Sequence, residues 1–174
     1  MRRLLLLRHA KAVQDEGGDD HARALNTRGQ ADAAKMGHAL DTHRLVPDLV
    51  LCSTAQRTVE TWELVAAELA RVPPVEFKKT LYLVPAKQIV KEICHAPDDV
   101  RTLMIIGHNP GMEDCASRLA HKPQSREEAK RLETLRDKFP TCALAVFEFD
   151  AESWKDVDAG AGALTHYLRP KDIA

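Results

Sequence analysis

The sequence lacks the cysteine patterns that identify zinc proteins and disulfide-rich domains. Its 174 residues include four cysteines, which are Cys52, Cys94, Cys115 and Cys142. They are widely separated and form no C-x-x-C pair, so we expect neither a zinc site nor a disulfide framework. Reduced and mostly buried thiols in a cytoplasmic protein fit this pattern better.

Long hydrophobic runs and an excess of one charge are also missing. Leu4 to Leu7 imitate the start of a signal peptide, but Arg8 and His9 interrupt the run before it reaches a workable length. No other stretch is long enough to cross a membrane. The 25 Lys and Arg residues nearly balance the 26 Asp and Glu residues. We therefore expect no nucleic-acid partner and no membrane partner, and any anion site must be local.

The motifs of nucleotide-binding, cysteine-dependent and metal-dependent enzymes are absent as well. Neither G-x-x-x-x-G-K-[ST] nor G-x-G-x-x-G occurs. A cysteine phosphatase needs five residues between its Cys and Arg, whereas Cys52 and Arg57 are separated by four and Cys94 and Arg101 by six. The histidines outside the motifs discussed below show no metal-ligand spacing: His21, His38, His43, His95, His121 and His166. We expect no metal and no cofactor.

A repeated strand-then-helix pattern is present. Three short apolar runs, typical of strands buried on both faces of a parallel sheet, are Leu4–Leu7, Leu49–Leu51 and Leu103–Ile106. Each is followed by a pattern typical of a helix start, and these are Thr27-x-x-Gln30, Ser53-x-x-Gln56 and Asn109-Pro110. Further segments predict a helix around Ile89, a surface helix over Ser125–Lys138, and strands over Ala143–Phe149 and Ala163–Leu168, the last at a sheet edge.

These elements predict an α/β fold in a single domain over residues 1–174. The 44% hydrophobic content is enough for one sizeable core. We expect a three-layer sandwich in which a central, mostly parallel sheet has helices on both faces.

Cationic and imidazole side chains follow three of the predicted strands. Arg8 and His9 follow the first, Arg57 lies just after the second, and His108 follows the third. Ligands of parallel α/β sheets bind at this edge, and guanidinium groups bind phosphoryl oxygens through paired hydrogen bonds. Helix N-termini at Ser53 and Asn109 would add N–H groups. The expected phosphate-binding residues are Arg8, Arg57, His108, Asn109 and Ser53.

Each of these residues alone has an ordinary structural explanation. Arg8 and His9 are compatible with a charged strand end and a partly buried imidazole. Arg57 is compatible with a surface arginine of a helix, and His108 with a turn residue that hydrogen-bonds a carbonyl. Their placement after three separate strands favours a shared site, because the ordinary explanations do not predict that placement.

Six segments resemble the histidine phosphatase superfamily in its SixA-like phosphohistidine phosphatase branch. Three carry the residues above: Leu-Leu-Arg8-His9-Ala10, Ser53-Thr54-Ala55-Gln56-Arg57-Thr58 and Ile106-Gly107-His108-Asn109-Pro110. Three more extend the resemblance over nearly the whole chain: Arg23-x-Leu25-Asn26-x-x-Gly29, Phe139-Pro140-Thr141-Cys142-Ala143-Leu144-Ala145 and Leu168-Arg169-Pro170-Lys171.

The resemblance implies a phosphatase in which His9 is the nucleophile that becomes phosphohistidine. It also implies that Arg8, Arg57 and His108 hold the phosphoryl oxygens. A neutral imidazole is available as a nucleophile near pH 7. Two arginines and two imidazoles would supply the positive charge that a metal ion provides elsewhere.

The sequence also departs from the larger members of this superfamily. The helical insertion that covers their site is absent, so we expect an open site and no cap domain. Asn109 stands where another branch has an acid, which leaves the general acid unidentified, with Asp19, Asp20 and Glu113 as candidates. The expected partner is a phosphohistidine-bearing signalling or phosphotransfer protein, or else a small phosphorylated molecule. A small-molecule phosphomonoesterase and a noncatalytic phosphoprotein-binding module remain alternatives.

Overall fold

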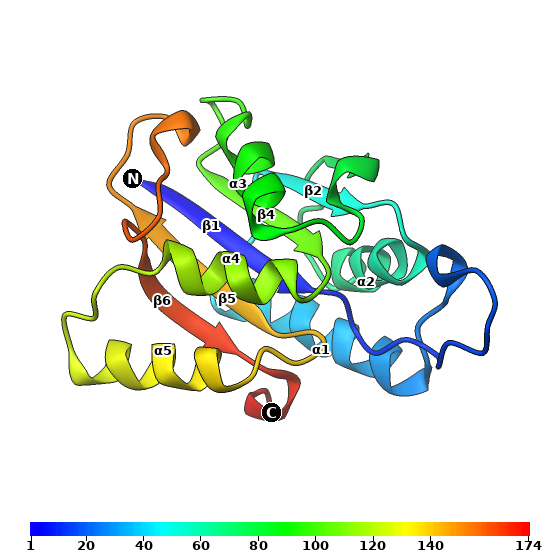
Figure 1. Ribbon diagram of the computed structural model, residues 1–174. Coiled ribbons are helices and arrows are strands. Elements are labelled where there is room, and N and C mark those ends of the chain that lie inside the picture. Colours follow the sequence, from blue (N-terminus) through cyan, green and yellow to red (C-terminus); the bar gives the residue numbers. More distant parts are fainter.

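A computed structural model of residues 1–174 contains one six-stranded sheet with helices on both of its faces (Figure 1). The strands are β1 (Arg2–Arg8), β2 (Leu49–Ser53), β3 (Val75–Lys78), β4 (Thr102–Gly107), β5 (Leu144–Phe149) and β6 (Ala163–Leu168). The helices are α1 (Thr27–Thr42), α2 (Gln56–Ala66), α3 (Ala86–Cys94), α4 (Gly111–Leu119) and α5 (Arg126–Asp137).

The strand order is β3-β2-β4-β1-β5-β6. The first four of these strands are parallel to one another. Strand β5 runs antiparallel to β1, and the edge strand β6 runs antiparallel to β5. The prediction of a three-layer α/β sandwich with a mostly parallel sheet is therefore confirmed.

Strand β1 lies inside the sheet, between β4 and β5. Its leucines alternate between the two faces, since Leu4 and Leu6 pack with α3, α4 and α5, while Leu5 and Leu7 pack with α1 and α2. All four are fully buried. Both faces of β1 are covered by helices, which explains its unbroken run of apolar side chains. Arg8 lies at the carboxyl end of this interior strand.

Two predicted helix starts at this edge are wrong. Helix α2 begins at Gln56 with Ala55 as its N-cap, because β2 continues through Ser53. Helix α4 begins at Gly111 rather than at Pro110. The Asn109 side chain nevertheless accepts a hydrogen bond from the Glu113 amide at 3.2 Å, so it satisfies one N–H group of the first turn of α4.

The other two N-caps are ordinary side-chain caps. Asn26 caps α1 by accepting from the Gly29 amide at 2.8 Å, so the cap lies one residue before the expected Thr27. Ser125 caps α5 as predicted, accepting from the Glu128 amide at 3.1 Å. Both bonds satisfy amides that a helix leaves without internal partners.

The cysteines are unpaired and mostly buried, as predicted. All four thiols are free, and three of them are buried. Burial raises the pKa of the Cys115 thiol to about 12 and also raises the pKa values of Cys52 and Cys142. These thiols are therefore protonated and unreactive near neutral pH. No helix is both long enough and apolar enough to cross a membrane.

Candidate active site

The topology brings the four principal predicted site residues to one edge of the sheet. Strands β2, β4 and β1 are parallel neighbours, so their carboxyl ends lie side by side. A pocket of about 300 Å³ opens there. It is lined by Arg8, His9, Lys11, Ala12, Asp20, Arg23, Arg57, Leu83, His108, Asn109 and Thr141. The other predicted residue, Ser53, does not line this pocket.

Three hydrogen bonds hold the backbone of His9 and Ala10. The His9 amide donates to the Gly107 carbonyl at 3.1 Å, and the His9 carbonyl accepts from the Cys142 amide at 2.9 Å. The amide of Ala10 donates to the Thr61 hydroxyl at 3.0 Å. These bonds tie the loop after β1 to β4, to α2 and to the segment before β5, so the imidazole is held in one position.

One nitrogen of the His9 ring, Nδ1, is hydrogen-bonded, and the other, Nε2, is not. Nδ1 lies 2.7 Å from the Ala10 carbonyl, and only an N–H can make that bond, so Nε2 carries the lone pair. Burial lowers the pKa of His9 to about 4, and the charges of Arg8 and Arg57 act in the same direction. The imidazole is therefore neutral at pH 7, the state that a nucleophile requires.

His108 faces His9 across the pocket, with their ring centroids 5.3 Å apart. Its Nε2 lies 2.7 Å from the Ser53 hydroxyl, whereas its Nδ1 is buried without a partner. Burial, followed by the influence of His9 and Arg57, lowers the pKa of His108 to about 3. The expectation that both imidazoles supply positive charge is wrong for the free pocket, because burial keeps both rings neutral.

The positive charge comes from arginines instead. Arg57 is 2% exposed, and its Nη1 donates to the Asp20 carbonyl at 2.8 Å. Arg8 donates from Nη1 to the Phe139 carbonyl at 3.1 Å. The Nε atoms of Arg8 and Arg57 are buried without partners. Buried donors without partners are costly, and their place at this pocket suits an anionic ligand.

Asp20 is the one general-acid candidate that lines the pocket. Its carboxylate accepts from the Tyr82 hydroxyl and from Arg57 and Arg23, the two arginines at 3.1 and 3.0 Å. The Tyr82 hydrogen bond, more than any other effect, stabilises the carboxylate and lowers the pKa of Asp20 to about 2. Asp20 is therefore ionised near pH 7 and holds no proton to donate.

The other two candidates lie outside the pocket. Asp19 is exposed, and its side chain accepts from the His21 amide at the start of the 3-10 turn Asp20–Ala22. Glu113 lies in the first turn of α4. The chain between α2 and β4 forms only β3, a 3-10 turn and α3, and a single residue of it, Leu83, lines the pocket. This agrees with the expected absence of a helical insertion over the site.

Several pocket residues had no assigned role in the sequence. Lys11, Arg23 and Thr141 line the pocket, and Arg23 and Thr141 stand in segments that supported the resemblance. Tyr82 contacts the pocket through Asp20, which lies 62 residues away in sequence. No local pattern predicts that contact, whereas the resemblance could have drawn attention to Arg23 and Thr141.

The fold and the pocket together define a class of protein. It is an α/β domain in which a neutral histidine lies among guanidinium groups at the carboxyl ends of parallel strands. The sequence profile of the histidine phosphatase superfamily (branch 1) matches residues 4–82. An uncharacterized protein of Mycobacterium tuberculosis is 34% identical over 165 residues, which cover 95% of this chain and 100% of the relative. The chain belongs to the histidine phosphatase superfamily.

Two solved structures place the chain in the SixA-like part of that superfamily. One is of a protein proposed to be the phosphohistidine phosphatase SixA of Nakamurella multipartitia, with 29% identity, a TM-score of 0.82, and coverage of 97% of this chain and 96% of that one. The other is a protein with the same proposed identity from Agrobacterium tumefaciens, with 28% identity, a TM-score of 0.76, and coverage of 97% and 98%.

Proposed function

We propose that this protein is a metal-independent phosphohistidine phosphatase that acts through a covalent intermediate on His9. The observation that carries the proposal is the neutral His9 ring, whose Nδ1 is bound to the Ala10 carbonyl and whose Nε2 is free among arginines. In the first step Nε2 attacks phosphorus and the bond from phosphorus to the substrate ring nitrogen breaks. A substrate imidazole that carries a proton on its other nitrogen takes the electron pair and departs as neutral imidazole. Water then attacks the phosphoryl group on His9, which releases inorganic phosphate and restores the neutral imidazole.

The guanidinium groups stabilise the transferred phosphoryl group. Arg8 and Arg57 line the pocket, each with a buried Nε that has no partner, and Arg23 adds a third guanidinium. Preorganised cations of this kind stabilise the charge on equatorial oxygens, so the reaction needs no metal ion. If the Ser53 hydroxyl donates to Nε2 of His108, then Nδ1 carries a proton that it can donate to the phosphoryl group. Ser53 then acts by positioning His108, and Asn109 remains a contact candidate at the pocket wall.

The protonation state of Asp20 supports phosphohistidine as the substrate. Departure of an alkoxide from a phosphate ester needs a proton donor, and the carboxyl group that lines the pocket is ionised. Imidazole is a far better leaving group, because its conjugate acid has a pKa of about 6.5. A pocket without a helical insertion over it also admits a side chain that projects from a folded protein. The four free thiols support a cytoplasmic location for this activity.

Two matched peptides test the proposal. One carries phosphohistidine and the other carries phosphoserine at the same position, and kcat/KM is measured for both in the presence of a chelator. We expect the phosphohistidine peptide to react at least about a hundredfold faster, because its ring can carry the required proton on its own second nitrogen, whereas the serine alkoxide needs a proton from an acid of the enzyme. Equal values would favour a general phosphomonoesterase. Binding of both peptides without turnover would favour a phosphoprotein-binding module.

A further inference from the structure

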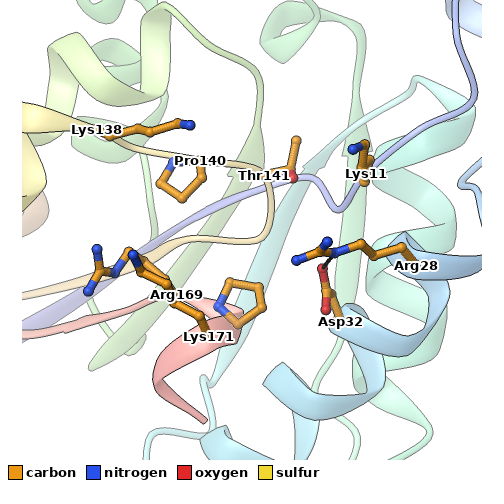
Figure 2. A pocket seen from close by; sticks show the side chains of 9 residues that line it. Lys11, Arg28, Asp32, Lys138, Pro140, Thr141, Arg169 and Lys171 are labelled. Carbon is orange, nitrogen blue, oxygen red and sulfur yellow. Dashed lines mark ion pairs between the residues drawn. The ribbon is translucent and has the colours of Figure 1, made fainter.

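A second, strongly basic pocket lies beside the candidate active site. It has a volume of about 270 Å³ and contains no hydrophobic residue. Figure 2 shows Lys11 and Arg28 on one side and Lys138, Arg169 and Lys171 on the other, with Pro140 and Thr141 between them. The remaining lining residues are Asp32 and Pro170. Nothing in the phosphoryl-transfer chemistry uses this pocket.

The cations of this basic pocket are only partly neutralised. Its lining has five cationic side chains and one acidic side chain, Asp32, which pairs with Arg28 at 3.7 Å. Arg169 pairs with Asp172 at 2.8 Å. Lys11, Lys138 and Lys171 have no carboxylate within 4.0 Å. Three exposed ammonium groups therefore surround one concavity without a counter-charge.

The basic pocket and the active site share a wall. Lys11 and Thr141 line both. The segment that carries Thr141 is fixed to the active site, because the Phe139 carbonyl accepts from Arg8 at 3.1 Å and from Asn109 at 2.9 Å. The Cys142 amide donates to the His9 carbonyl. A group bound in the basic pocket therefore lies next to the phosphoryl site.

The backbone of Lys11 is fixed just as firmly. The Asn26 amide donates to the Lys11 carbonyl at 3.0 Å, and a Cβ atom at Gly29 would lie 2.0 Å from that oxygen. The start of α1 thus packs directly against the loop that follows His9. The Lys11 side chain is exposed, while its backbone is held by the start of α1.

We propose that this basic pocket is a docking subsite for carboxylate groups that surround the phosphorylated residue on a protein substrate. The proposal rests on the proposed function and names the surface chemistry of its substrate. Exposed lysines hold a single small anion weakly, because each ion pair at a surface contributes little. Several lysines together create a positive field that steers an acidic protein surface toward the adjacent site. No aromatic side chain is present to stack a nucleobase or another planar group.

Two phosphohistidine peptides test this preference. They share one sequence, except that glutamates flank the phosphohistidine in one and glutamines in the other. At low salt we expect kcat/KM to be about tenfold higher for the glutamate peptide, with the difference shrinking as salt screens the charges. Equal kcat/KM values at low salt would overturn the proposal.

A pair of charge-reversed variants identifies the surface responsible. Lys138→Glu combined with Lys171→Glu should abolish the preference, while hydrolysis of an aryl phosphate stays within about twofold, since neither lysine lines the catalytic pocket. The control combines Lys122→Glu with Lys155→Glu, two exposed lysines outside the basic pocket, and changes the net charge equally. A preference lost equally in both double variants would reflect overall charge and would overturn the proposal.

A binding measurement separates this proposal from the proposed function. Fluorescence anisotropy follows a labelled, unphosphorylated glutamate peptide as it binds the wild type, the double variant and the control. Binding that only the Lys138→Glu, Lys171→Glu variant loses supports the subsite, even if neither phosphohistidine peptide is hydrolysed and the proposed function fails. Binding that this variant retains, or no binding to the wild type, would overturn the subsite while leaving the hydrolysis result intact.

Discussion

The two ends of β1 each carry an arginine, but the two arginines have different hydrogen-bond partners. Arg2 is 5% exposed, and its guanidinium donates to the carbonyls of Asp98 at 2.6 Å, Val100 at 2.8 Å and Glu152. It also lies 6.0 Å from the centre of the Trp154 ring. Arg8, at the other end, makes one hydrogen bond, to Phe139, and has a buried Nε without a partner.

This difference separates a structural arginine, Arg2, from Arg8, whose unpaired Nε suits a ligand-binding role. A buried cation that is fully hydrogen-bonded stabilises the segments it joins, whereas a buried donor without a partner lowers stability until an anion binds. Four buried side-chain polar atoms have no partner, and three of them belong to the pocket: Arg8 Nε, Arg57 Nε and His108 Nδ1. The unsatisfied donors of the molecule are thus concentrated where phosphate is proposed to bind.

Removing the proposed nucleophile tests the role of the pocket beside Arg8, and among these variants it should lower activity the most. His9→Ala should lower kcat on a phosphohistidine peptide about a thousandfold or more, because covalent transfer loses its acceptor. The midpoint of urea unfolding at pH 7.5 should change little, since the ring makes only one side-chain hydrogen bond. An activity within tenfold of the wild type would remove His9 from the mechanism.

Truncating Arg57 should have the next largest effect. Arg57→Ala should cost about 2 to 4 kcal/mol of transition-state stabilisation, measured as the ratio of kcat/KM values, because a preorganised donor pair is lost. Arg57→Lys is the matched control. It keeps the charge but not the two-pronged geometry, so it should recover only part of the activity. A rate for Arg57→Ala within a few-fold of the wild type would contradict the role proposed for the pocket.

Removing Arg2 tests the other end of β1. Arg2→Met should lower the free energy of unfolding by about 2 to 3 kcal/mol, because the carbonyls of Asp98 and Glu152 lose their side-chain donor, while Val100 keeps the bond from Trp154. Urea denaturation measures this loss, and kcat/KM of the folded variant should remain within twofold. Arg3→Met is a suitable control: Arg3 is partly exposed and pairs with Glu148 at the surface, so its loss should be smaller. A drop of more than twofold in kcat/KM of the folded Arg2→Met variant would contradict the assignment of Arg2 to stability alone.

The pH dependence of stability should show the smallest of these effects. His108 has a pKa of about 3 in the folded protein, below the value of about 6.5 in an unfolded chain. Above pH 6.5 the ring is neutral in both states. As the pH falls toward 3, the unfolded chain binds a proton that the folded chain excludes, so the free energy of unfolding decreases.

His108→Gln should remove this contribution. Between pH 7.5 and pH 5, the wild type should lose about 1 to 2 kcal/mol more stability than the variant. Urea denaturation at the two pH values provides the measurement. Equal losses in the two proteins would mean that His108 is not kept neutral by burial, and the electrostatic description of the pocket would need revision.

The sequence predicted the features that depend on local pattern. Short apolar runs marked the parallel strands because both faces of β1, β2 and β4 are buried. The order of these strands then placed His9, Arg57 and His108 in one pocket. Asn109 also lines that pocket, whereas Ser53 lies behind His108.

The wrong and missing predictions involve contacts between distant residues. Ser53 fits the pattern of a helix cap, but its hydroxyl bonds His108, which is 55 residues away in sequence. The contact of Asp20 with Arg57 spans 37 residues. Burial of the two imidazoles, which removes their positive charge, depends on packing from several elements at once. None of these effects leaves a local pattern in the chain.

The central claim is that His9, which follows the carboxyl end of β1, accepts the phosphoryl group from the substrate. The most direct test is to incubate the protein briefly with a phosphohistidine peptide, quench in alkali, and locate the phosphoryl group by mass spectrometry. The account predicts one acid-labile, base-stable phosphoryl group on His9, present in the wild type and in Arg2→Met and absent from His9→Ala. A phosphoryl group on any other residue, or an equal amount of adduct in His9→Ala, would contradict it.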